Sequence, residues 1–250
     1  IPGEPLIEYC NTRMLDLRQR LEVLVAVCDG VRHAHEKGVI HRDLKPSNIL
    51  VAESSGRPQP RIIDFGVAKA TEQRLTDKTL FTHMQTFIGT PAYMSPEQAQ
   101  SKVVGPAADV YATAVLLFEL LTGRRLFQGE TALSVMLQHV NDPPPRLADV
   151  APELGTFPNL EVILQRALCK KPELRQASIA DLRAQLASVD TTGSGASIVP
   201  VALAETADSL PRTSVEKAPS ASPKKQGVGF SLQAWGCSIQ LMVAVGAAAL

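Results

Sequence analysis

The sequence predicts an α+β fold that is mainly helical and carries one small β-hairpin. Residues 109–121 form a nearly unbroken apolar run that suits a buried helix, and several other segments show helical apolar spacing. Two short β-prone runs are separated by a turn-rich stretch. The 250 residues, 45% hydrophobic and 20% charged, suffice for one compact core and exclude a disordered or collagen-like chain.

The first strong element is a helix over residues 16–37. Asp16, followed by Gln19 three residues later, resembles a capping box, and Gly38 is the residue type that commonly ends a helix. The apolar residues recur at the three- and four-residue spacing of a helix with one buried face: Leu21, Leu24, Val25, Cys28 and Val31.

A small hairpin is expected next. Strands over residues 49–52 and 61–63 flank an exposed turn over residues 53–60, where Ser, Gly and Pro gather. Residues 64–96 show no sustained period and are rich in Thr, which predicts a long irregular loop. Loops of this length inside compact domains are usually functional.

The remaining elements are helices. The apolar run over residues 109–121 is too short to span a bilayer and predicts the central core helix, with Gly123 just past its end. Three further segments show helical spacing: residues 131–139, 159–169 and 178–189.

Charge and cysteine usage exclude several classes of function. The 25 basic and 25 acidic residues balance, so no global field steers the chain onto nucleic acid, and we expect no nucleic-acid partner. The four cysteines are scattered without metal-ligand spacing, which excludes a zinc knuckle or a disulfide framework and fits a reducing compartment. The N-terminus carries no secretory signal pattern, and the first residue is not Met.

The C-terminal part has a different composition. Residues 190–227 are rich in Ser, Thr, Ala, Pro and Gly, which predicts a flexible linker. Residues 228–250 lack charge and as a helix would reach roughly 34 Å, so we expect a transmembrane helix that tethers a cytoplasmic domain to the inner (plasma) membrane. Lys224 and Lys225 would then face the cytoplasm. Polar residues dilute the run, so an interfacial or disordered apolar tail is the alternative.

The most informative run is residues 41–48, His-Arg-Asp-Leu-Lys-Pro-Ser-Asn, followed by Asp-Phe-Gly at residues 64–66. Gly-Thr-Pro at residues 89–91 and Ser-Pro-Glu at residues 95–97 come next. In order and spacing these runs resemble the protein kinase family, and the Lys-Pro pair with Thr90 resembles its serine/threonine branch, of bacterial type. The resemblance covers roughly residues 1–188 and implies a protein-kinase-like fold.

The resemblance implies a role for each polar residue of the motif. Asp43 would accept the proton of a Ser or Thr hydroxyl on a protein substrate, and Lys45 would hold positive charge against the transferring phosphoryl group of ATP. Removing one such donor typically costs about 3 kcal/mol. Asn48 and Asp64 would supply oxygen ligands to Mg²⁺, and Leu50 would form part of the apolar floor beneath adenine.

The resemblance also implies regulatory residues. Arg42 would pair with a phosphorylated residue of the activation segment and so order that loop. The candidates are Thr79, Thr82 and Thr86, with Thr90 at the end of the segment; taken singly, each threonine is better explained as an ordinary loop residue.

Two structural roles follow as well. Glu97 and Arg175 resemble a family ion pair that ties the end of the activation segment to the helical lobe. Histidines outside the motif are interpreted as packing or surface residues: His33, His35, His83 and His139.

The small N-terminal β lobe of the family is expected to be absent. Only about forty residues precede the motif, whereas that lobe needs roughly 80. Residues 1–10 would be a remnant of the inter-lobe hinge, extended over residues 2–9, and residues 11–189 the catalytic lobe. The sequence thus favours a truncated serine/threonine kinase, and the alternative is a non-catalytic module that docks a partner protein.

Overall fold

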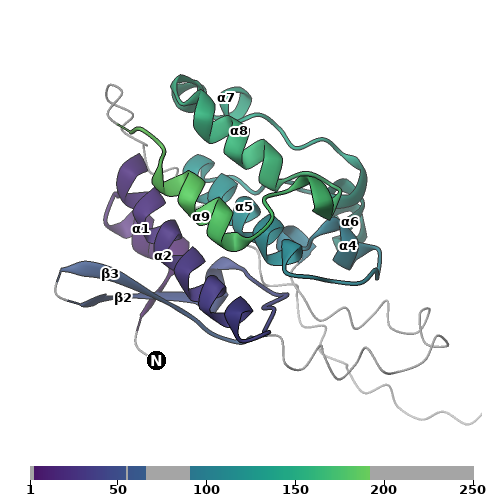
Figure 1. Ribbon diagram of the computed structural model, residues 1–250. Coiled ribbons are helices and arrows are strands. Elements are labelled where there is room, and N and C mark those ends of the chain that lie inside the picture. Colours follow the sequence, from purple (N-terminus) through teal and green to yellow (C-terminus); the bar gives the residue numbers. More distant parts are fainter. Residues whose placement is uncertain (1–2, 55, 66–90, 192–250) are drawn as a thin grey trace, which may run out of the picture. The chain divides into compact units, whose positions relative to one another are not determined.

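Helix α5 (Ala107–Thr122) lies at the centre of the described helices (Figure 1). Every residue from Ala108 to Thr122 is buried, and α5 packs against α2 (Leu17–Glu36), α8 (Pro158–Ala167) and α9 (Ile179–Ala187). Gly123 ends the helix in the left-handed conformation, with φ 66°, which a residue without a Cβ adopts at little cost. The predicted core helix is therefore confirmed.

The computed structural model describes residues 3–54, 56–65 and 91–191. In these ranges the remaining elements are β1 (Glu4–Pro5), α1 (Leu6–Thr12), β2 (Ile49–Ser54), β3 (Arg57–Ile62), α4 (Pro96–Ala99), α6 (Ala132–Asn141) and α7 (Leu147–Val150), with 3₁₀ turns at Pro46–Asn48, Pro91–Tyr93, Pro152–Thr156 and Pro172–Leu174.

Helix α2 begins and ends as the sequence predicts. The Asp16 side chain accepts a hydrogen bond from the Gln19 backbone N–H at 2.8 Å, and Gln19 Oε1 accepts one from the Asp16 backbone at 3.0 Å. Gly38 follows the helix with φ 74°. The buried face of α2 packs against α9 and β3, which fixes the helix that leads into residues 41–48 (Figure 1).

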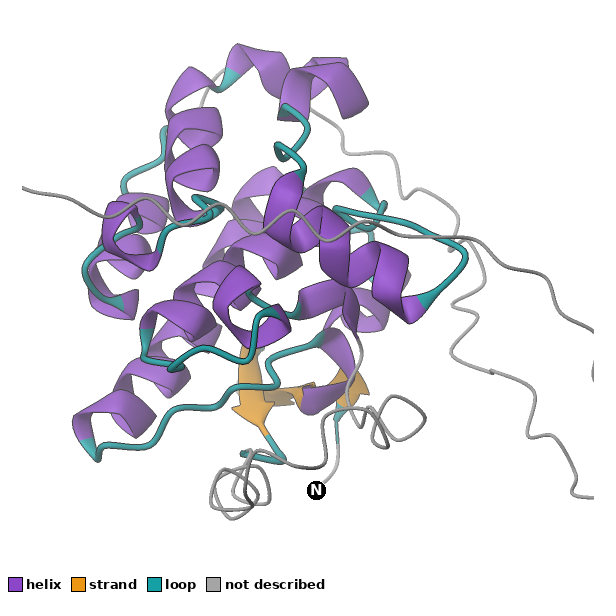
Figure 2. Ribbon diagram, turned by 90° about the vertical axis from the view of Figure 1, so that its right-hand side faces the viewer, coloured by secondary structure: helices purple, strands orange, loops and turns teal. Residues whose placement is uncertain are grey.

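The sheet is a small antiparallel one in the order β1-β2-β3, set at one edge of the helices (Figure 2). The hairpin is confirmed, but its strands are longer and its turn shorter than predicted, because β3 includes Pro58 and Pro60. Both prolines lie on the edge strand of the described sheet, two residues apart, where a missing N–H is tolerated.

The extended conformation expected for residues 2–9 is wrong beyond Pro5. Residues Leu6–Thr12 form α1, because Leu6, Tyr9 and Cys10 share one face at helical spacing and are all buried. Only the two residues of β1 are extended and pair with β2.

Several predictions lie outside the described residues. These are most of the irregular loop and the linker, the whole segment over residues 228–250, and the four candidate threonines. Over the ranges that are described, no helix combines the length and apolar character needed to cross a membrane.

Candidate functional site

The backbone of residues 41–48, the motif loop, is held by Asp109, a fully buried carboxylate in the first turn of α5. Asp109 Oδ2 accepts a hydrogen bond from the His41 backbone N–H at 2.8 Å, and Oδ1 accepts one from the Arg42 N–H at 2.9 Å. His35 Nε2 lies 2.7 Å from Oδ2. A negative charge is favoured at a helix N-terminus, so α5 itself stabilises the group that shapes the loop.

Arg42 adopts a left-handed backbone conformation, with φ 64°. A non-glycine residue in this region costs of order 1–3 kcal/mol unless its surroundings hold it there. Both sides of Arg42 are held, since its N–H donates to Asp109 and its carbonyl accepts from Gln98 Nε2 at 2.6 Å. Because Gln98 belongs to α4, the loop is clamped between α4 and α5.

His41 is fully buried and has one defined tautomer. The Asp43 backbone N–H donates to His41 Nδ1 at 3.3 Å, so Nδ1 is the acceptor and Nε2 carries the proton. That Nε2–H donates to the Ile63 carbonyl at 3.0 Å. His41 therefore connects the motif loop to the end of β3.

Three of the predicted site residues form one contact group. Lys45 Nζ lies 3.5 Å from Asp43 Oδ2, and Asn48 Nδ2 donates to the same oxygen at 3.4 Å and to the Asp43 carbonyl at 2.8 Å. The side chains of Lys45 and Asp43 are 22% and 25% exposed, so they remain accessible to a bound molecule. Asn48 is buried and fixes the loop on which both stand.

Asp64 lies where β3 leads back to this group. The neighbouring Ile63 N–H donates to the Asn48 carbonyl at 2.9 Å, and the ring of Phe65 lies 4.8 Å from that of His41. Asp64 is exposed and has φ 55°, the second left-handed non-glycine residue of this region. Its neighbours on both sides are thus tied to the motif loop.

The other predicted site residues are only partly described. Leu50 is half-buried on β2, on the strand face opposite Ile49 and Val51. Arg42 Nε is buried and has no hydrogen-bond partner among the described residues. Thr79, Thr82, Thr86 and Thr90 lie in the range the structure leaves undescribed.

The Glu97–Arg175 ion pair forms as expected. Arg175 Nη1 and Nη2 each donate to a different oxygen of Glu97 at 2.8 Å, and both side chains are almost completely buried. Burial by itself raises the pKa of Glu97, but the hydrogen bonds and positive charge of Arg175 outweigh it and hold the pKa below its ordinary value. The pair joins α4 to the segment between α8 and α9.

A second buried glutamate, Glu119, lies near the C-terminal end of α5. The Tyr93 hydroxyl donates to Glu119 Oε2 at 2.5 Å. Burial raises the pKa of Glu119, against the opposing effects of the Tyr93 hydrogen bond and the Arg125 charge. Tyr93 belongs to the 3₁₀ turn Pro91–Tyr93, so this contact anchors that turn to α5.

The same turn is held by His139 of α6. Its Nε2 donates to the Ala92 carbonyl at 3.1 Å, which leaves Nδ1 to accept from the Tyr111 hydroxyl at 2.9 Å. Burial and the nearby Lys170 charge lower the pKa of His139 to about 4, so the ring is neutral near pH 7. The packing role predicted for His139 is correct, with the addition of this hydrogen-bonded bridge.

Sequence reasoning missed His35 and Gln98 as positioning residues. The sequence predicts only a packing or surface role for His35, whereas its ring contacts Asp109, 74 positions away. Gln98 completes a capping box with Ser95, a local signal that was present in the sequence, but its bond to the Arg42 carbonyl was not predictable. Contacts across such separations depend on how α2, α4 and α5 pack.

The oxygen atoms of the motif loop and of Asp64 are of the kind that binds Mg²⁺ together with a nucleotide. Asn48 directs its amide nitrogen to Asp43, so its carbonyl oxygen and the exposed Asp64 carboxylate are the oxygens suited to a hard cation. Over the described ranges, no group of three or more His, Cys, Asp or Glu side chains gathers for a metal. A site made only of Asn48 and Asp64 would therefore depend on oxygens of the nucleotide and of water.

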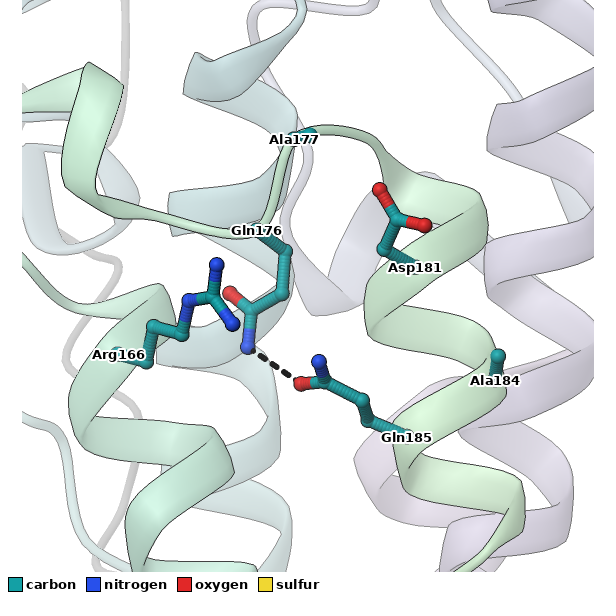
Figure 3. Close-up of a pocket in the computed structure, with 6 residues that line it drawn as sticks. All are labelled: Arg166, Gln176, Ala177, Asp181, Ala184 and Gln185. Atoms are coloured by element: carbon teal, nitrogen blue, oxygen red, sulfur yellow. Dashed lines mark hydrogen bonds between the residues drawn. The ribbon is translucent and has the colours of Figure 1, made fainter.

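A hollow of about 360 Å³ between α8 and α9 is separate from this group (Figure 3). Gln176 lies at its centre, and its Nε2 donates to Gln185 Oε1 at 3.0 Å and to the Ile163 carbonyl at 3.1 Å. Its lining comes entirely from residues 166–185, so it contains no part of the motif loop.

Comparison with known proteins decides the family. The family model of the protein kinase domain matches residues 2–185. The chain belongs to the protein kinase family. This kinase domain is 39% identical over 184 residues to the serine/threonine-protein kinase Pkn1 of Myxococcus xanthus, an alignment that covers 73% of this chain and 26% of Pkn1.

Other relatives are also bacterial serine/threonine kinases. The chain is 35% identical over 172 residues to PknB of Mycobacterium leprae, covering 69% of this chain and 26% of that protein. It is 33% identical over 229 residues to pkn3 of Myxococcus xanthus, covering 90% of this chain and 41% of that protein. The chain thus spans about a quarter to two fifths of the length of these relatives.

Proposed function

We propose that residues 11–189 form the catalytic lobe of a protein serine/threonine kinase, which transfers the γ-phosphoryl group of ATP to Ser or Thr hydroxyls of proteins. One observation supports this most strongly. Asp43 Oδ2 lies beside Lys45 Nζ and Asn48 Nδ2, at 3.5 and 3.4 Å, on a loop whose backbone hydrogen-bonds to a buried carboxylate. Family membership and the names of the relatives support the same reaction.

In this proposal each side chain acts at a stated atom. Asp43 accepts a hydrogen bond from the substrate hydroxyl and takes its proton as the oxygen bonds to phosphorus. The Lys45 ammonium stabilises negative charge on the transferring group, and its partial exposure lets it reach that group. Bound Mg²⁺ and ATP supply the phosphoryl group and neutralise its charge; Asn48 and Asp64 would hold the metal through oxygen atoms.

The remaining roles extend this proposal. Leu50 would contribute to the apolar surface beneath adenine, since it is half-buried beside the motif loop. Arg42 would bind a phosphorylated threonine through its guanidinium, and Thr79, Thr82, Thr86 and Thr90 are the candidates. The buried Nε of Arg42, which lacks a partner among the described residues, supports this assignment.

Replacing Asp43 tests the proposed function. In the longest natural reading frame that contains residues 1–250, Asp43→Asn should lower the rate of Ser/Thr phosphorylation by about 10²- to 10⁴-fold, because a general base contributes that much. The melting temperature should change little, since the Asp43 side chain is partly exposed. Asp149→Asn, the same change at an exposed carboxylate on α7, serves as the matched control and should keep full activity.

The alternative is a non-catalytic docking module. If the wild-type protein transfers no phosphate to protein substrates, or if Asp43→Asn transfers it at the wild-type rate, the kinase proposal is wrong. A partner that binds the wild-type protein and Asp43→Asn equally, with no phosphate transfer by either, would support the docking module instead.

We also propose that residues 228–250 anchor the lobe to a membrane, with residues 190–227 as the linker and Lys224 and Lys225 on the cytoplasmic side. The support is the uncharged apolar run in the sequence. The full chain should partition into the membrane fraction and need detergent for extraction, and a deletion after Gly227 should abolish that partitioning. Equal distribution of the two proteins would contradict the anchor.

A further inference from the structure

Side chains hold both of the peptide groups that flank Asp43. The peptide group before it is bound at two edges, since the Arg42 carbonyl accepts from Gln98 Nε2 at 2.6 Å. At the other edge of that group, the Asp43 N–H donates to His41 Nδ1 at 3.3 Å. The following carbonyl, that of Asp43 itself, accepts from Asn48 Nδ2 at 2.8 Å. Because peptide groups are planar, fixing these two planes also fixes the direction in which the Asp43 side chain leaves the backbone.

Of these three contacts, the one from Gln98 comes from outside the motif loop. His41 and Asn48 belong to the loop itself, whereas Gln98 lies on α4, 56 positions from Arg42 in the sequence. The Gln98 side chain is half-buried, so the bond is partly shielded from water that would compete for the Arg42 carbonyl. Gln98 is thus a support that the loop cannot supply from its own residues.

The orientation of the Gln98 amide group is fixed by Ser95. The Ser95 backbone N–H donates to Gln98 Oε1 at 3.0 Å, and the Ser95 hydroxyl oxygen lies at the same distance from that atom. Exchanging the positions of Oε1 and Nε2 would bring an N–H against an N–H and an oxygen against a carbonyl oxygen. Only one orientation satisfies both neighbours, so Nε2 is directed at the Arg42 carbonyl.

The backbone that carries Gln98 is also held. The preceding residue, Glu97, is buried and ion-paired to Arg175 through two bonds of 2.8 Å, which attaches α4 to the helical core. Pro96 occupies the first position of α4, where its fixed φ suits the start of a helix. With its backbone held in this way, Gln98 needs little further ordering to bind the motif loop.

The conformation of Arg42 requires such a support. Its φ of 64° lies in the left-handed region, which a non-glycine residue keeps only where its surroundings hold it there. Asp109 binds the Arg42 N–H at 2.9 Å, and Gln98 binds the Arg42 carbonyl. Without the second of these bonds, the peptide group before Asp43 would be free to rotate, and the Asp43 carboxylate would turn with it.

We propose that Gln98 is a positioning residue for phosphoryl transfer: its amide nitrogen fixes the peptide group before Asp43 and so directs the Asp43 carboxylate at the substrate hydroxyl. The inference rests on the proposed kinase function and adds to it a residue that acts through the backbone of Arg42. A misplacement of about 1 Å can cost a large part of a catalysed rate. Gln98 should therefore affect kcat and leave KM for ATP and for the protein substrate unchanged.

The test is Gln98→Glu, which keeps the shape of the side chain but places a carboxylate, without a hydrogen to donate, in front of the Arg42 carbonyl. In the longest natural reading frame that contains residues 1–250, kcat should fall about tenfold at roughly pH 8, which is about the factor that one hydrogen bond is worth. KM for ATP and for a serine peptide should stay at the wild-type values.

The pH dependence of Gln98→Glu identifies the hydrogen bond. Protonation gives the introduced carboxyl group an O–H that can donate to the Arg42 carbonyl. Half-burial and the facing carbonyl both favour this neutral form. The ratio of the variant kcat to the wild-type kcat should therefore return towards one as the pH falls from roughly 8 to 5.5.

Two variants serve as controls. Gln98→Met has no donor at any pH, so its loss of kcat should be the same throughout the pH range. Gln100→Glu makes the same change at an exposed position just after α4 and should keep the wild-type kcat. Hydrogen–deuterium exchange of residues 41–45, measured by mass spectrometry without nucleotide, should be faster in Gln98→Met and unchanged in Gln100→Glu.

The outcomes separate the positioning role from the proposed function. A wild-type kcat in Gln98→Glu and Gln98→Met would reject the positioning role, and so would an equal loss in Gln100→Glu. A loss in Gln98→Glu that does not change with pH, or a change in KM alone, would also reject it. Faster exchange in Gln98→Met, with no phosphorylation by the wild-type protein, would support the contact between Gln98 and the loop and reject the kinase function.

Discussion

The motif loop and the surroundings of Arg175 both gather charged groups, but in opposite ways. All five N–H groups of Arg175 are used: two bind Glu97, and three bind the carbonyls of Cys169, Ala107 and Lys170. Asp43 and Lys45 instead lie 3.5 Å apart with about a quarter of each side chain exposed. The buried, fully paired charges serve the architecture here, whereas the accessible pair is the one that we propose acts in phosphoryl transfer.

The largest effect is expected from breaking the buried pair. Arg175→Met removes the partner of Glu97 and leaves its carboxylate buried, so the free energy of unfolding should fall by about 3–5 kcal/mol. Denaturant titration measures it. The double variant Glu97→Leu/Arg175→Met removes both charges and should recover most of that loss.

That double variant separates two explanations. If it is as unstable as Arg175→Met alone, the lost hydrogen bonds to the three carbonyls matter more than the buried charge. The stability of the Arg175 site would then come from its hydrogen bonds to backbone carbonyls rather than from its pairing with Glu97.

The next largest effect should come from replacing Asp109. This carboxylate is fully buried on α5 and holds the backbone of the motif loop. Asp109→Asn replaces one accepting oxygen by an N–H donor that faces a backbone N–H. The loss of hydrogen bonds to a charged group should lower the free energy of unfolding by about 1.5–3 kcal/mol. Phosphorylation should fall further than stability alone explains, because the backbone of Arg42 loses a support.

Thr113→Val provides the matched control for Asp109. Thr113 donates to the Asp109 backbone carbonyl at 2.7 Å, so its loss alters a neighbouring bond and leaves the carboxylate intact. Activity per folded molecule should stay at the wild-type level in Thr113→Val. A parallel drop in both variants would show that general disturbance of α5 explains the loss.

The sequence predicted the local features well, whereas the one long-range ion pair that it predicted, Glu97–Arg175, came from the family resemblance. The ends of α2, the buried character of α5 and the hairpin followed from capping residues, apolar runs and turn residues, which act within a few positions. Helix α1 was missed because its seven residues are too few to show a clear period. The proximity of Asp43, Lys45 and Asn48 was predictable from one short motif, whereas His35 and Gln98 reach the loop only through packing.

A smaller effect is expected at Tyr93, the hydroxyl partner of the second buried glutamate. Tyr93→Phe removes its hydrogen bond to Glu119 without changing the packing of the ring, so the free energy of unfolding should fall by about 1 kcal/mol near neutral pH. Thermal or denaturant unfolding measures this. A loss as large as that of Arg175→Met would mean that Glu119 depends on its hydrogen-bond partner as strongly as Glu97 does.

The smallest effect is a difference in pH dependence between the two buried glutamates. The pKa of Glu97 is lowered in the folded state, so the stability it contributes is present above its ordinary value of 4.5 and is lost as pH falls through the folded pKa. The pKa of Glu119 is raised, so its contribution is present below 4.5 and is lost as pH rises through the folded pKa.

Unfolding free energies of the wild type, Glu97→Gln and Glu119→Gln, measured from roughly pH 3 to 7, should therefore diverge in opposite directions. The advantage of the wild type over Glu97→Gln should grow as pH rises, and its advantage over Glu119→Gln should shrink. The opposite signs follow from the partners, because a guanidinium stabilises a carboxylate in a buried site more than a hydroxyl does. If the two differences from the wild type changed with pH in the same way, Tyr93 and Arg175 would stabilise the charged carboxylates equally. The pKa values of the two glutamates would then not be shifted in opposite directions.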